Sequence, residues 1–126
     1  MATLQAATTS NGAIVTDEVA VSELCGRYDF GMLDWRIEDD GTFSIWGYDS
    51  FEVYSTRDDG LPDHENGVQT EEFLTELVAY LVDGEELDIR TAGFTKCRFP
   101  VLAQRYVIYD GAVLHADLTG LEPIDE

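Results

Sequence analysis

The clearest pattern along the chain is a helical one between residues 70 and 84. Apolar side chains recur there at spacings of three and four, which places them on one face of a helix. They are Phe73, Leu74, Leu77, Val78 and Leu81. Thr70 precedes the pattern as an N-cap and Gly84 follows it, so we predict a helix over 71–83. A shorter helix is predicted over 17–25, although alternating valines there also permit a strand.

Alternating apolar residues predict strands between the two helices. Within 28–38 the alternation changes parity at Gly31, which requires a bulge or a break in the strand. A three-residue hairpin loop ending at Gly41 is favoured over a two-residue loop. Only the longer loop sets Trp35 opposite Ile45 and so pairs apolar residues with apolar residues.

Further strands complete the predicted sheet. A third strand of the first meander runs from Phe51 to Ser55. After the helix, strands are predicted over 86–93 and 101–109, and the second has apolar residues on both faces, as a central strand should. The dipeptide Asp110-Gly111 then predicts a type I′ hairpin turn into a last strand.

Together these elements predict one α+β domain over residues 13–120. Its antiparallel sheet has about six strands, in the order α-βββ-α-βββ, and helix 71–83 packs on one face. The small polar residues 1–12 are predicted to be disordered, and residues 121–126 form an acidic tail. Both halves begin with a threonine and two acids and contain an Asp-Gly turn, so a duplicated αβββ unit stays open.

The amino-acid composition indicates the kind of environment in which this protein folds. The 126 residues carry 26 acids against 7 basic residues, a formal charge of −19, yet 44% are hydrophobic, which is ordinary for a folded chain. Such acidity with a single lysine is typical of cytosolic proteins of salt-in halophiles such as haloarchaea. Self-repulsion weakens a compact state of this charge in dilute buffer, and concentrated salt screens the repulsion.

The charge and the absent motifs exclude several classes of function. Phosphate contacts need many cationic side chains and weaken in salt, so nucleic acid and anionic membranes are unsuitable partners. No apolar run is long enough for a membrane span, and the first residues lack the features of a secretion signal, so we expect a cytoplasmic protein. Cys25 and Cys97 have no metal-binding spacing, and no cofactor motif occurs.

Residues 89–109 differ from the rest of the chain because they contain no acid. This stretch holds four of the seven basic residues: Arg90, Lys96, Arg98 and Arg105. Aromatic residues are interleaved with them, a mixture that suits an anionic ligand with a flat or apolar part. Structural ion pairs with nearby acids, or an interaction surface, would account for the same pattern.

Other candidate chemistry is weaker. The hairpin register sets Tyr106 opposite His115, a pair suited to acid–base work, but no third group orients the imidazole and a half-buried cross-strand pair is favoured. Cys97 lies between two cations that would lower its pKa, yet it points away from both in an extended segment. The run Asp63 to Asn66 offers oxygen ligands, but a solvated loop explains it better than a metal site.

The favoured function is therefore a non-catalytic module that uses stretch 90–106 to bind an acidic protein partner or a small anion. The candidate residues are Arg90, Lys96, Arg98, Arg105, Tyr106 and His115. The alternative is a small enzyme with an arginine-lined anion pocket and acid–base chemistry by His115 or Tyr106. Convergence of the arginines and His115 on one concavity would favour the enzyme. A homodimer is left open.

Overall fold

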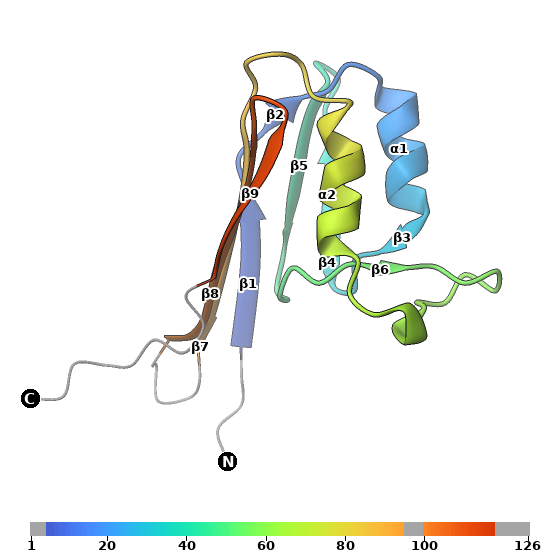
Figure 1. The fold of residues 1–126 in the computed structure, drawn as a ribbon, viewed down its shortest axis with the longest axis vertical. Coiled ribbons are helices and arrows are strands. Elements are labelled where there is room, and N and C mark those ends of the chain that lie inside the picture. The colour runs from blue at the N-terminus through green and yellow to red at the C-terminus, as the bar shows by residue number, and fades with distance from the viewer. Residues whose placement is uncertain (1–4, 95–99, 118–126) are drawn as a thin grey trace, which may run out of the picture.

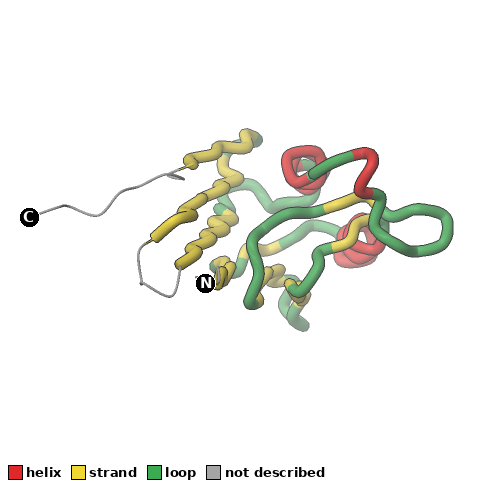
Figure 2. Tube along the Cα trace, turned by 90° about the horizontal axis from the view of Figure 1, so that it is seen from below, coloured by secondary structure: helices red, strands yellow, loops and turns green. Residues whose placement is uncertain are grey.

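The computed structural model describes residues 5–94 and 100–117, and it confirms the α+β class. Two helices lie on one face of an antiparallel sheet, and a short two-stranded sheet lies beside them (Figure 1). Figure 2 shows both helices on the same side of the main strands. The other face of the large sheet therefore carries no helix.

The described elements follow in chain order. The strands are β1 (Gln5–Ser10), β2 (Ala13–Ile14), β3 (Tyr28–Asp29), β4 (Leu33–Ile37), β5 (Thr42–Gly47), β6 (Tyr54–Ser55), β7 (Leu87–Phe94), β8 (Pro100–Tyr109) and β9 (Ala112–Asp117). The helices are α1 (Glu18–Gly26), the single 3₁₀ turn η1 (His64–Asn66) and α2 (Thr70–Val78).

The large sheet has the spatial order β4, β5, β1, β7, β8, β9, with β2 continuing the line of β1 along the same side of β5. Every pair is antiparallel. Strand β1 is thus near the middle of the sheet, where it joins the β4–β5 hairpin to the three strands after α2. Within the described residues, β4 and β9 form the two edges.

Both predicted hairpin registers are confirmed. Trp35 lies opposite Ile45, and Gly41 has a φ of 87°, which the three-residue loop requires. In the second hairpin Tyr106 lies opposite His115. The two turn residues, 110 and 111, have φ values of 52° and 76°, the pair of positive values that defines a type I′ turn.

The prediction that residues 1–12 are disordered is wrong for residues 5–10, which form β1. Thr8 shows why a small polar segment lies in the sheet interior. Its hydroxyl donates to the carbonyl oxygen of Asp49 at 2.7 Å and lies 2.8 Å from the hydroxyl of Thr91, so the buried polar atoms are satisfied. The predicted tail, 121–126, lies outside the described residues.

The first meander also differs from its prediction. The break predicted as one of two possibilities at Gly31 is present, since this residue, with a φ of 63°, separates β3 from β4. Strand β6 pairs with β3 in the small sheet instead of extending the β4–β5 hairpin. The described parts of the two halves are therefore not built alike, since β3 and β6 have no counterpart in residues 79–94 and 100–117.

Both helices lie close to their predicted positions, with different ends. Asp17 rather than Thr16 caps α1, because its carboxylate accepts from the backbone N–H of Ala20 at 3.0 Å. Helix α2 ends at Val78 instead of residue 83. The carbonyl oxygen of Tyr80 accepts from the N–H of Thr16 at 2.7 Å, which draws the chain out of the helix and alongside β2.

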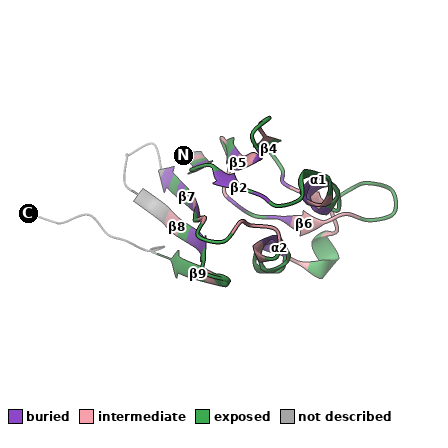
Figure 3. Ribbon diagram, turned by 90° about the horizontal axis from the view of Figure 1, so that it is seen from above, coloured by how far each residue is buried: buried purple, intermediate pink, exposed green. Residues whose placement is uncertain are grey.

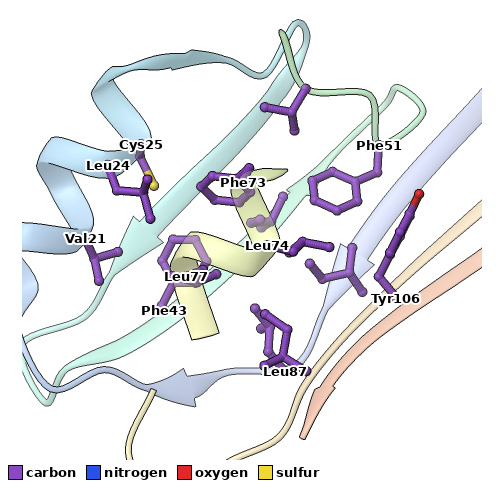
Figure 4. Close-up of a cluster of buried hydrophobic side chains, with 14 of the residues drawn as sticks. Val21, Leu24, Cys25, Phe43, Phe51, Phe73, Leu74, Leu77, Leu87 and Tyr106 are labelled. Atoms are coloured by element: carbon purple, nitrogen blue, oxygen red, sulfur yellow. The ribbon is translucent and has the colours of Figure 1, made fainter. Parts of the chain in front are cut away.

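The core lies between the helices and the helix-side face of the sheet (Figures 3 and 4). Its largest fully buried side chains are Phe43, Phe51, Phe73, Leu24, Ile45, Leu74, Leu77, Leu87, Ile89, Ile108, Val21 and Val53. Phe73 of α2 contacts Phe30 edge-on, with ring centroids 5.1 Å apart. This packing buries one face of the sheet, while no helix of the described residues covers the opposite face.

Candidate functional site

Arg90 and Arg105 lie side by side on the helix-free face of the sheet. They are direct cross-strand partners on β7 and β8. Their strand neighbours Ile89 and Tyr106 point to the opposite, helix-covered face and are buried. The pairing of two cations would be unfavourable without a counter-ion, because like charges directly opposite each other destabilise a sheet.

Asp88 is the counter-ion, and both arginines share it. The Nε and Nη2 atoms of Arg105 donate to its two carboxylate oxygens at 3.0 and 2.8 Å. Arg90 donates from the same two atoms at 3.4 and 3.0 Å. The hydrogen bonds from Arg105, reinforced by those from Arg90, lower the pKa of Asp88 to about 2, so the carboxylate is charged throughout the ordinary pH range.

The backbone of Asp88 is held by the end of β1. The side-chain oxygen of Asn11 accepts from the N–H of Asp88 at 2.8 Å, and the N–H of Asn11 donates to the carbonyl oxygen of Asp88 at 3.3 Å. The central strand therefore positions the counter-ion, and the counter-ion orients the two guanidinium groups. Asp88 shares a face with Arg90 because they are two residues apart in one strand, so sequence parity contained this signal.

The arginine pair stays largely in solvent. The side chains of Arg90 and Arg105 are 65% and 49% exposed, whereas that of Asp88 is 15% exposed. A depression of about 390 Å³ adjoins the pair. Its lining residues are Arg90, Thr91, Ala103, Gln104, Arg105 and Ala116. Because the alanine side chains are small, the guanidinium groups project beyond the surface around them.

Trp46 lies in the same cross-strand line as the arginine pair, and sequence reasoning missed it. Asp34 of β4 pairs with Trp46, and Trp46 pairs with Thr9 of β1. Thr9 in turn pairs with Arg90, so one continuous row crosses five strands. The indole of Trp46 is 40% exposed. The row cannot be assembled from the sequence without knowing that β1 joins β5 to β7.

Tyr106 and His115 form a second group on the opposite, helix-covered face. Their rings stack with centroids 4.2 Å apart and an interplanar angle of 7°. Tyr106 also contacts Phe51 edge-on at 5.6 Å (Figure 4). Burial, and then the nearby charge of Glu71, raises the pKa of Tyr106. The sheet itself separates this pair from the arginines, so the six predicted residues do not share one pocket.

Lys96 and Arg98 lie outside the described residues, as does Cys97. The prediction that they belong to the site therefore stays a prediction. Of the described basic residues, Arg27, Arg36 and Arg57 each lie within 4 Å of an acid at the surface. Arg90 and Arg105 differ from those three because they converge on one shared carboxylate.

No protein-family model, curated protein or solved structure matches this chain. The geometry of the described residues is therefore the basis for any assignment of function.

Other hollows differ in their linings. A hollow of about 240 Å³ is lined by acids together with Tyr54 and His64. One of about 500 Å³ lies between the residues after α2 and the β8–β9 turn, and its lining contains acids but no basic residue. In residues 5–94 and 100–117, no three His, Cys, Asp or Glu side chains are placed to hold a metal ion. Asp63, in the run for which a solvated loop was favoured over a metal site, caps η1 by accepting from the N–H of Asn66.

Neither helix of the described chain has the length and apolar character that a membrane span requires.

Proposed function

We propose that this protein is a non-catalytic interaction module that docks a carboxylate-bearing protein partner on the helix-free face of its sheet. The observation that carries the proposal is the Arg90–Arg105 pair on that face, oriented by a single carboxylate and still 65% and 49% exposed. Arginine is enriched at interface centres because its planar fork binds carboxylates bidentately.

The pair is preorganised for a second carboxylate. Each guanidinium uses Nε and Nη2 for Asp88, and within the described residues its Nη1 N–H groups have no hydrogen-bond acceptor, so they can donate to an incoming group. Because Asp88 already fixes both side chains, a partner would lose less side-chain entropy on binding. Asp88 offsets the charge of one of the two arginines, and the nearby charge of Glu86 also acts on Arg105.

The surface supports a protein partner better than a small anion. Ala92 and Ala103 pair next to the arginines and make the surrounding surface low and open. Small molecules bind in concave sites that bury most of their area, whereas protein interfaces are broad and contain exposed aromatic residues such as Trp46.

The enzyme alternative receives no support from the geometry. Its acid–base residues, Tyr106 and His115, lie on the helix-covered face, while Arg90 and Arg105 lie on the helix-free face. A substrate held by the arginines would therefore have the sheet between itself and the imidazole. We retain the docking function alone.

We expect Arg105→Gln to weaken capture of partner proteins from a lysate in high salt by about tenfold, with little change in melting temperature. Loss of a charged contact at an interface centre costs on the order of 1–3 kcal/mol, and 1.4 kcal/mol is tenfold. The measurement is quantitative mass spectrometry of proteins retained on the tagged chain, beside a thermal melt.

Arg57→Gln is the matched control. Arg57 also makes a forked contact to an aspartate, Asp59, at 3.2 and 2.6 Å, and its side chain is 50% exposed, but it lies in the loop after β6. Equal capture by the two variants and the unmodified chain would contradict the proposal. An equal loss of captured protein in both variants would also contradict the proposal. The loss would then result from the change in net charge and not from the position of Arg105 on the helix-free face.

A further inference from the structure

We infer that the docked partner is a second copy of this chain, packed face to face on the helix-free surface. The inference rests on the docking function proposed above and names its partner. It comes from the order of charges across the sheet, which is self-complementary.

The row that crosses the sheet has its charges separated. It runs from Asp34 through Trp46 and Thr9 to Arg90 and Arg105. The acid is at one end, the two cations are at the other, and an exposed indole lies between them. Asp34 is exposed and makes no ion pair within residues 5–94 and 100–117. Among the described residues, no cation competes with one from a second copy for this carboxylate.

A two-fold axis parallel to the strands reverses this row in the second copy. Strand β4 of one copy then lies over β7 or β8 of the other, so Asp34 meets Arg90 or Arg105, and the contact occurs twice because the interface is isologous. Trp46 lies over the centre of the opposing row, within reach of a guanidinium for a cation–π contact. An axis perpendicular to the strands through this row would instead set like charges against each other.

A second row supports the same arrangement. This second row lies two residues further along the strands. On β4 it contains Arg36, which pairs with Ser44 of β5. On β7 the same row contains Asp88, which is hydrogen-bonded to Asn11 at the end of β1. Strand β4 thus carries a negative and then a positive charge, and β7 carries a positive and then a negative one in the same direction. Placing β4 over β7 gives two complementary contacts in place of one.

The charge of this face selects a second copy over an unrelated acidic protein. The outward charged residues of the described strands are Asp34, Arg36, Asp88, Arg90 and Arg105. Their formal sum is +1, or zero with Glu86, which directly precedes β7 and interacts with Arg105, in a chain of −19. Two copies therefore meet through a face that carries little of the chain's negative charge. An unrelated, strongly acidic protein would be attracted only weakly to a nearly neutral surface. A second copy of this face can instead place its acids against the arginines of the first copy and its arginines against the acids.

The area of the face sets the expected strength. Six strands spaced by ~4.8 Å, with about six residues each at ~3.3 Å, cover about 24 by 20 Å. This is about 500 Å² per copy, below the ~800 Å² per partner of a standard stable interface. We therefore expect a weak, concentration-dependent dimer with a dissociation constant in the range of about 1–100 μM.

A charge exchange between two variants tests the inference. In Asp34→Arg two arginine-bearing ends would face each other, and in Arg90→Glu two acidic ends would, because β4 of one copy lies over β7 of the other. Each variant alone should have its dissociation constant raised by about 100-fold or more. A mixture of the two should form a heterodimer again, because the new residues oppose one another and the remaining Arg90 opposes the remaining Asp34.

The measurement is sedimentation equilibrium of the full chain in ~1 M KCl, up to about 1 mM protein, with thermal melts to show that each variant folds. A monomeric unmodified chain at 1 mM would overturn the inference, as would a dimer indifferent to both variants or a mixture that fails to associate. If the chain is monomeric while Arg105→Gln still loses a different captured protein, the docking face stands and only the identity of the partner is wrong.

Discussion

Leu77→Ala is expected to lower the free energy of unfolding by about 2–5 kcal/mol, the range for removing a buried leucine side chain. Leu77 is fully buried, on the face of α2 that packs into the core beside Phe43 (Figure 4). The structure around the deleted atoms can relax only in part, so a cavity adds to the lost transfer free energy. Denaturant unfolding at fixed salt measures the change.

Leu61→Ala is the matched control, because the same atoms are removed from a side chain that is 55% exposed in the loop before η1. The control should change stability by no more than about 0.5 kcal/mol, the usual range for surface substitutions. If Leu77→Ala fell within that same range, α2 would not be held to the sheet as described.

Raising the KCl concentration from ~0.1 M to several molar is expected to raise the melting temperature by more than about 10 °C. The chain carries a charge of −19, and a Debye length that shrinks from about 10 Å to about 3 Å at 1 M removes most of the repulsion among its acids. Several kcal/mol of stabilisation correspond to a shift of this size in a domain of about this length. Circular dichroism melts across the salt series provide the measurement.

A variant in which three exposed acids are neutralised serves as the control. It distinguishes screening of the repulsion among acids from a general stabilising effect of salt. The variant combines three substitutions at exposed positions that are distant in sequence from the arginine cluster: Glu23→Gln, Asp58→Asn and Glu65→Gln. Together they remove three negative charges. This variant should melt higher at low salt and show a smaller salt shift. A melting temperature independent of salt in the unmodified chain would refute the link between its acidity and a high-salt environment.

The sequence predicted those parts of the fold that depend on local chemistry. The two hairpins have the expected registers because their turns need glycine at positive φ, and because only one loop length pairs Trp35 with Ile45. Helix α2 was predictable from its apolar face. Its end was not, because Tyr80 is drawn to Thr16, a contact between segments 64 residues apart.

Strand β1 was not predicted because its extended structure depends on pairing with the neighbouring strands β5 and β7. A run of alanine and threonine has no apolar alternation to distinguish it from a disordered terminus, and tertiary pairing overrides such weak local preference. Its placement between β5 and β7 also determines the candidate site. The pairing of Arg90 with Arg105 could be read from two adjacent strands, but the row that includes Asp34 and Trp46 exists only because β1 connects them.

Acrylamide quenching of Trp46 tests the docking role of the helix-free face most directly. The chain has two tryptophans, and Trp35→Phe leaves Trp46, 40% exposed on this face, as the one fluorescent reporter. We predict that quenching of Trp46 falls as the protein concentration rises through the dissociation constant, and that it stays constant when Asp34→Arg is added. Association detected by sedimentation with no change in the quenching of Trp46 would show that the chain binds its partner through another surface.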